Sequence, residues 1–117
     1  MSHLNDETTL FTKIINREIP ADIVYEDARC IVIKDIMPQA PTHVLLIPKK
    51  VIPKLNDMSL EDEGLMGYLM SRIPVVTQLL GLEDYRVVIN HGASAGQTVF
   101  HLHIHLMGGR DLSWPPG

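Results

Sequence analysis

The segment from residue 101 to residue 107 alternates histidine with hydrophobic residues, and this alternation constrains the fold more than any other feature. The segment reads His101-Leu102-His103-Ile104-His105-Leu106-Met107. Side chains on a β-strand point alternately to opposite faces, so a strand here places the three histidines on one face, about 6.6 Å apart. The aliphatic residues between them then face the core. We therefore predict a strand over residues 98–107, with one face for stability and the other free for chemistry.

Three histidines on one strand face have three interpretations. A chance arrangement is improbable with aliphatic residues placed regularly between them. A metal site is the second interpretation, because neutral imidazole binds Zn²⁺ well. However, same-face positions on one strand diverge, and no nearby cysteine or carboxylate obviously completes a metal shell. The third is catalysis, in which one histidine attacks and the others orient it or move protons. The pattern favours catalysis, and we expect neither a metal nor a cofactor.

Two further features of the sequence point to the same site. A segment rich in Gly and Ala, residues 91–96, precedes the predicted strand. Such a segment lets backbone N–H groups approach phosphate oxygens, although a plain tight turn explains it equally well. Gln97 and Thr98 would add hydrogen bonds at the same place. His43 shares the inward face of another predicted strand with Leu45, so it is either a satisfied core histidine or a group that fixes another histidine's tautomer.

The remaining segments predict an α+β fold: a five-stranded antiparallel sheet with one short and one long helix. Apolar residues at helical spacing predict the short helix over 8–16. Ser59, with Asp62 three residues later, indicates the start of the long helix, and Gly81 its end. Pro74 lies inside this helix and removes one backbone hydrogen bond. The predicted strands cover residues 23–25, 29–34, 42–48, 85–90 and 98–107.

Length and composition limit the classes of function. The 117 residues predict a single domain, 1–117, with a loose tail over about 1–7 and a C-terminal tail over 108–117. The net charge of −4 and the scattered Lys and Arg residues argue against a nucleic-acid partner. The single cysteine, Cys30, excludes an internal disulfide and fits a cytoplasmic setting. Neither a signal peptide nor a long apolar run is present, so we expect no membrane association.

Motifs spread over about residues 10–117 resemble the histidine triad (HIT) family, and within it the histidine triad nucleotide-binding protein branch. In the family signature, each of three histidines is followed by hydrophobic residues, as in the segment 101–107. The C-terminal motif helps to separate this branch from other branches of the family. The motifs that carry the resemblance are Phe11-Thr12-Lys13-Ile14-Ile15, Arg17-Glu18-Ile19-Pro20-Ala21, Asp35-Ile36, Pro38-Gln39-Ala40-Pro41-Thr42-His43, Ile47-Pro48-Lys49-Lys50, Tyr85-Arg86-Val87-Val88-Ile89-Asn90, Gly96-Gln97-Thr98-Val99-Phe100-His101, Gly108-Gly109-Arg110 and Trp114-Pro115-Pro116-Gly117.

The resemblance implies a HIT-like fold whose sheet extends across a homodimer. It also implies a metal-free purine nucleoside phosphoramidase, a hydrolase that cleaves the P–N bond of adenosine or guanosine 5′-phosphoramidates such as AMP-lysine. His103 would attack phosphorus and form a nucleotidyl-histidine intermediate, with His43, His101 and His105 in supporting catalytic roles. A neutral His103 nucleophile needs its Nδ1–H held by a carbonyl. The alternative function is a regulatory module that binds AMP or GMP with little turnover.

The resemblance also assigns residues to each part of the nucleotide. Asp35 would contact the ribose hydroxyls, with Ile36 beside it. Ile33 occupies a base-pocket position that is often aromatic, which predicts a weaker base stack. The base pocket would be lined by Phe11, Ile14, Ile19 and Leu45, and the phosphate would be surrounded by Asn90, Gly96, Gln97, Thr98, Val99, His101 and His105.

Overall fold

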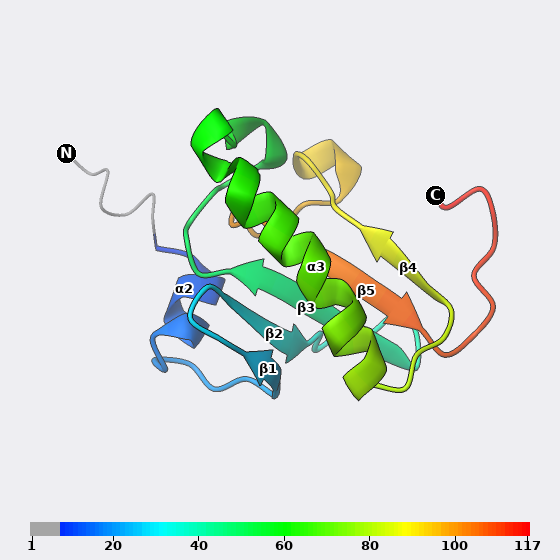
Figure 1. The fold of residues 1–117 in the computed structure, drawn as a ribbon. Helices are drawn as coiled ribbons and strands as arrows, with labels where there is room; N and C mark the ends of the chain where they lie inside the picture. The colour runs from blue at the N-terminus through cyan, green and yellow to red at the C-terminus, as the bar shows by residue number, and fades with distance from the viewer. Residues whose placement is uncertain (1–7) are drawn as a thin grey trace.

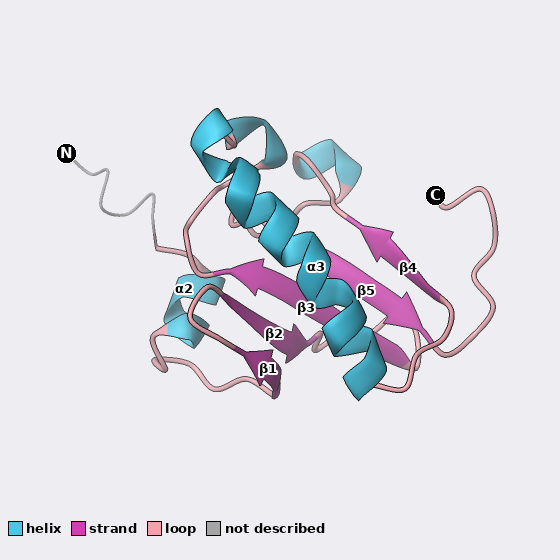
Figure 2. Cartoon of the chain, in the orientation of Figure 1, coloured by secondary structure: helices cyan, strands magenta, loops and turns pink. Residues whose placement is uncertain are grey.

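The computed structural model describes residues 8–117 as a five-stranded antiparallel sheet with a helix packed on each face (Figure 1). The tail predicted for residues 1–7 lies outside the described residues. No helix over residues 8–117 is long and apolar enough to cross a membrane. The strands and helices, coloured by type in Figure 2, are α2 (Leu10–Ile15), β1 (Ile23–Glu26), β2 (Cys30–Lys34), β3 (Thr42–Pro48), α3 (Glu63–Leu79), β4 (Tyr85–Val88) and β5 (Ile104–Gly108), with 3₁₀ turns η1 (Leu55–Asp57), η2 (Leu60–Asp62) and η3 (Ala93–Ala95).

The strand order is β1-β2-β3-β5-β4, and every neighbouring pair is antiparallel. The registers align one residue from each of four strands in a row across the sheet. Ile23 pairs with Ile33, Ile33 with Leu45, and Leu45 with His105. We call these four residues the transverse row. Three strand spacings of about 4.8 Å make the row about 14 Å long.

The two faces of the sheet carry separate apolar clusters. Strands β2 and β3 are buried on both faces, so each contributes alternate residues to the two clusters. On one face, the predicted stripe of α3 is buried against the sheet: Leu65, Leu69, Ile73 and Val76. On the other face, Phe11 and Ile14 of α2 pack against Ile31, Ile33, Leu45 and Ile47. The α3 face therefore holds the larger core, and the α2 face carries a smaller one.

The predicted last strand was too long at its start. It was expected to cover 98–107, but β5 begins at Ile104. Its partner β3 pairs with it only as far as the Leu46–Ile104 pair. Upstream of this pair the chain makes a different contact, because the Leu102 N–H donates to the Ile52 carbonyl at 2.6 Å. Alternation along the sequence indicates extended backbone, whereas a strand also needs a partner alongside it.

The long helix also begins later than predicted. The Ser59 N–H donates to Asp62 Oδ2 at 2.9 Å, and the Asp62 N–H donates back to the Ser59 carbonyl at 2.9 Å. These reciprocal bonds close the 3₁₀ turn η2, and α3 itself begins at Glu63. The helix continues through Pro74 to Leu79. The predicted N-terminal signal is thus present, but it caps a 3₁₀ turn that leads into the helix.

Gly108, at the end of β5, is packed too tightly for any side chain. A Cβ at this position would lie 2.9 Å from the Asp84 carbonyl oxygen and 2.9 Å from a methyl group of Leu82. We expect Gly108→Ala to lower the free energy of unfolding by about 1–3 kcal/mol, because the backbone must shift to relieve the overlap. Gly67→Ala in α3 is the control, since no atom lies within 4 Å there and the change should raise stability. Urea denaturation of both variants checks this, and equal stabilities would contradict it.

Candidate active site

A cavity of about 560 Å³ opens on the α2 face of the sheet, beside the transverse row. Its volume is in the usual range for small-molecule sites. Aliphatic and aromatic side chains form most of its wall. His103 and His105 also line it. Many of the residues predicted to contact a ligand line it: Phe11, Ile14, Ile19, Asp35, Ile36, Leu45, Thr98, Val99, His103 and His105. Residues brought together from α2, β2, β3 and β5 thus form one site.

The backbone carbonyl of His101 holds the ring of His103. His103 Nδ1 lies 2.8 Å from this oxygen. A carbonyl oxygen only accepts hydrogen bonds, so the proton is on Nδ1 and Nε2 carries a free lone pair. Burial lowers the pKa of His103 below its usual value, which favours the neutral ring at pH 7. The predicted carbonyl contact is therefore confirmed, and it leaves one imidazole nitrogen ready to act as a nucleophile.

His43 and His105 form a hydrogen-bonded pair. The Gln39 N–H donates to His43 Nδ1 at 3.0 Å, so a neutral His43 carries its proton on Nε2. That nitrogen lies 2.9 Å from His105 Nδ1 and donates to it, which places the His105 proton on its own Nε2. Burial lowers the pKa of His43, and burial together with the neighbouring His103 and His43 lowers the pKa of His105 to about 4. The pair therefore fixes the tautomer of His105, one of the two roles foreseen for His43.

The ring of His101 lies behind the cavity and does not line it. It is fully buried, and its Nε2 lies 2.8 Å from the Pro48 carbonyl oxygen. Its Nδ1 lies 3.1 Å from Thr9 Oγ1. Phe11 packs edge-on against both His101 and His103, with ring centroids 5.8 Å and 5.0 Å apart. His101 thus supports the site from within, whereas it was predicted to surround the phosphate.

The Gly- and Ala-rich segment is held in place by Gln97. The Gln97 Oε1 accepts from the Gly92 N–H at 2.8 Å, and its Nε2 donates to the carbonyls of Pro53 and Val99 at 2.8 and 3.1 Å. Gln97 is buried, and both the oxygen and the nitrogen of its side-chain amide have backbone partners. Asn90, Gly96 and Gln97 do not line the cavity, unlike Thr98 and Val99. Of these three, Gln97 is the one whose bonds hold the loop, and the contacts of Asn90 and Gly96 with a phosphate stay predictions.

The model of the HIT domain family matches residues 16–112. The chain belongs to the HIT family. An uncharacterized HIT-like protein of Synechocystis sp. is 58% identical over 112 residues, covering 95% of this chain and 98% of that protein. The crystal structure of a HIT family hydrolase from Legionella pneumophila superposes with a TM-score of 0.90 at 46% identity, covering 94% of this chain and all of that one. A histidine triad nucleotide-binding protein from Candida albicans superposes with a TM-score of 0.78 at 31% identity, covering 92% and 83% of the two chains.

A carboxylate lies beside two of the HIT histidines, contrary to the expectation that none completes a metal shell. Ligand atoms of Asp35, His43 and His105 all lie within 4.8 Å of one another. A relative from Zea mays, 49% identical over 121 residues that cover all of this chain and 94% of that protein, is named 14 kDa zinc-binding protein. The spacing of the two histidine nitrogens, 2.9 Å, fits a shared proton better than a shared Zn²⁺, whose tetrahedral ligand atoms lie about 3.4 Å apart.

Sequence reasoning missed three features of this HIT site. It did not predict the Thr9 contact with His101, the Gln39 N–H bond to His43, or the approach of Asp35 Oδ2 to His43 Nε2 at 3.5 Å. Thr9 itself can be recognised from the sequence as an N-cap residue, but that signal does not indicate its contact with His101. The other two depend on the register of β2 and β3, which no local pattern encodes.

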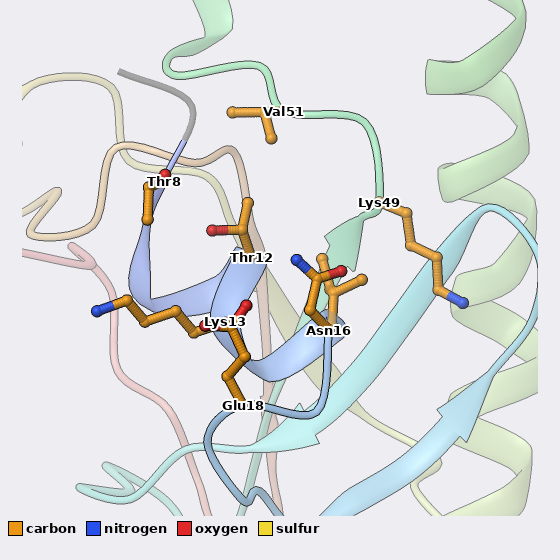
Figure 3. Close-up of a pocket in the computed structure, with 8 residues that line it drawn as sticks. Thr8, Thr12, Lys13, Asn16, Glu18, Lys49 and Val51 are labelled. Carbon is orange, nitrogen blue, oxygen red and sulfur yellow. The ribbon is translucent and has the colours of Figure 1, made fainter. Parts of the chain in front are cut away.

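A second cavity, of about 380 Å³, lies on the outer side of α2 and lacks the means to do comparable chemistry. It is lined by Thr8, Thr12, Lys13, Ile15, Asn16, Glu18, Lys49 and Val51. Figure 3 shows the amino groups of Lys13 and Lys49 pointing away from each other. Lys49 Nζ is also paired with Glu26 at 2.8 Å. With no histidine in its lining and its cations diverging, this cavity is a weaker candidate than the first.

Proposed function

We propose that this HIT-family chain is a purine nucleoside phosphoramidase of the histidine triad nucleotide-binding branch. In this proposal it hydrolyses the P–N bond of adenosine or guanosine 5′-phosphoramidates. The contact between His103 Nδ1 and the His101 carbonyl carries the proposal, because it prepares a neutral histidine with a free Nε2 in a largely apolar cavity. The names of the Legionella and Candida relatives, hydrolase and nucleotide-binding protein, support the same class of activity.

The dimensions of the cavity suit a nucleoside monophosphate. Three residues of the transverse row, His105, Leu45 and Ile33, line the cavity and span about 10 Å, so a phosphate near His105 and a base near Ile33 can lie across the strands. In this pose the base packs between Phe11 and Ile33 on the apolar wall. Asp35 accepts hydrogen bonds from the ribose hydroxyls, and Thr98 donates to a phosphoryl oxygen.

The His43–His105 pair supplies and removes the proton that the reaction needs. The bound phosphate anion favours a protonated pair, in which His43 Nδ1 gives up its bond with the Gln39 N–H and takes one extra proton. His103 Nε2 attacks phosphorus, the P–N bond breaks, and His105 gives its Nε2 proton to the leaving amine. Water then attacks phosphorus, the His103–phosphorus bond breaks, and the pair takes the proton of that water. The mononucleotide leaves, and both the pair and His103 have returned to their starting states.

Hydrolysis of an adenosine 5′-phosphoramidate with a fluorescent amine tests the proposal. We expect amine release that continues in a chelator, with AMP as the second product. Binding of AMP without turnover would instead favour the regulatory nucleotide-binding module. Loss of turnover on chelation, restored by Zn²⁺, would favour a metal site at Asp35, His43 and His105. A uridine phosphoramidate is the control for base preference, because a smaller base fills less of the apolar wall.

We infer that the chain works as a homodimer joined through β4 and α3. Over the described residues, β4 pairs with β5 on one side only, so its outer edge is free to extend the sheet. Val87 of β4 and Val75 and Leu79 of α3 are exposed aliphatic residues, and a second copy would cover them. Sedimentation velocity should give twice the mass of one chain, and Val87→Lys should shift the protein toward monomer. A wild-type monomer at micromolar concentration would contradict this inference.

A further inference from the structure

The N-terminal cap of α2 is linked directly to the buried histidine. Thr9 is the N-cap residue of α2, and its Oγ1 accepts the Thr12 N–H at 3.1 Å. The same oxygen lies 3.1 Å from His101 Nδ1, although 92 residues separate the two along the chain. A hydroxyl can accept one bond while it donates another, so a single oxygen serves both the helix and the histidine.

The direction of the second bond follows from the other side of the His101 ring. His101 Nε2 lies 2.8 Å from the Pro48 carbonyl, so the ring must carry a proton on Nε2. Burial lowers the pKa of His101, so the ring is neutral and its Nδ1 is an acceptor. Thr9 therefore donates its hydroxyl proton to Nδ1. Without that donor, a fully buried nitrogen would lack a partner.

We propose that Thr9 is a positioning residue, whose hydroxyl fixes His101 so that the His101 carbonyl holds His103 Nδ1–H and leaves Nε2 free to attack. The bonds run from Thr9 to the His101 ring, and from the His101 carbonyl to the His103 ring at 2.8 Å. The same cap sets the start of α2, whose Phe11 packs edge-on against both rings. Thr9 thus connects the helical wall of the cavity to the orientation of His103. This inference rests on the proposed function, because it assigns a part in the proposed reaction.

Three substitutions separate the two tasks of the hydroxyl. Thr9→Ser keeps both the cap and the donor. Thr9→Asp keeps a strong cap but offers His101 an acceptor in place of a donor. Thr9→Val keeps the shape and removes both. We expect kcat close to wild type for Thr9→Ser, and about tenfold lower for Thr9→Asp and Thr9→Val, with KM changed less than about threefold.

A second measurement reads the histidines without turnover. Long-range ¹H–¹⁵N NMR of the imidazole nitrogens distinguishes a protonated Nδ1 from an unprotonated one. We expect wild type and Thr9→Ser to show the Nε2–H form of His101 and the Nδ1–H form of His103, and Thr9→Asp to alter the His101 signals. If Thr9→Asp has wild-type kcat and unchanged His101 signals, the hydroxyl is only a helix cap and the inference is overturned. If wild type itself has no turnover, the proposed function fails, while the NMR spectra still decide whether Thr9 sets the tautomers.

Discussion

Under the proposed function, replacing His103 by alanine should lower kcat for an adenosine phosphoramidate by roughly a thousandfold or more, because of the two histidines that line the cavity only His103 has an unprotonated Nε2. Affinity for AMP should change less than about threefold, since the apolar wall and Asp35, which we propose bind the nucleoside, remain. Stopped-flow kinetics and calorimetric titration with AMP measure the two effects separately.

The matched control is His91→Ala, because His91 is the same residue type and does not line the cavity. It should keep wild-type kcat. Partial recovery of His103→Gly by added imidazole would further support nucleophilic attack, since free imidazole can occupy the vacated space. Retained turnover in a folded His103→Ala protein would remove His103 from its assigned role.

The protein should lose stability as the pH falls from 6.5 to about 4. Burial holds the pKa of His105 at about 4, below the 6.5 of an unfolded chain. The unfolded state therefore binds the proton first, and the stability that is fully present above pH 6.5 is lost by the time the pH reaches the folded pKa. His105 alone accounts for a loss of up to about 3 kcal/mol over this window. Lowered pKa values of His43, His101 and His103 add to the loss.

Urea titrations at pH 7.5, 6 and 5 measure this loss as a falling midpoint. His105→Gln is the control, since glutamine has no proton to take up and the fall should be shallower. Asp27 does not add to the loss of stability in this window. Hydrogen bonds from Tyr68, Arg29, Tyr25 and Cys30 lower its pKa despite the opposing effect of burial, so its contribution is lost only at pH values below about 3.8. A midpoint that stays constant between pH 7.5 and 5 would contradict the burial of neutral histidines.

The sequence predicts a strand best when residues at the ends of that strand determine where it begins and stops. The prediction for β3, residues 42–48, matches the structure because Pro41 precedes the strand and Pro48 ends it. The prediction for β5 was wrong at its start because its boundary depends on where β3 stops pairing with it. The stripe of α3 was predictable from periodicity alone, and four of its residues are buried.

The site was predictable in its residue types and less so in its contacts. The alternating pattern pointed to the histidines, and the carbonyl bond to His103 was expected from the chemistry of the proposed nucleophile. The Asp35–His43 approach and the Thr9–His101 bond join residues from different elements. Such pairs depend on strand register and helix docking, so no spacing in the sequence reveals them. Gln97 was predicted to contact the ligand because it is a polar residue beside the site. Its amide instead bonds the backbone of Gly92 and Pro53.

The transverse row has a consequence for how such a protein can change over evolution. Its four residues are distant in sequence but adjacent in the sheet, one from each of four strands. A point substitution at Ile33 or Leu45 alters one stretch of the wall and leaves the others in place. A one-residue insertion within β2 or β3 would turn the following side chains to the opposite face and mix the two cores. Ligand preference in this lineage should therefore diverge by substitution within the strands, while insertions and deletions collect in the loops that connect them.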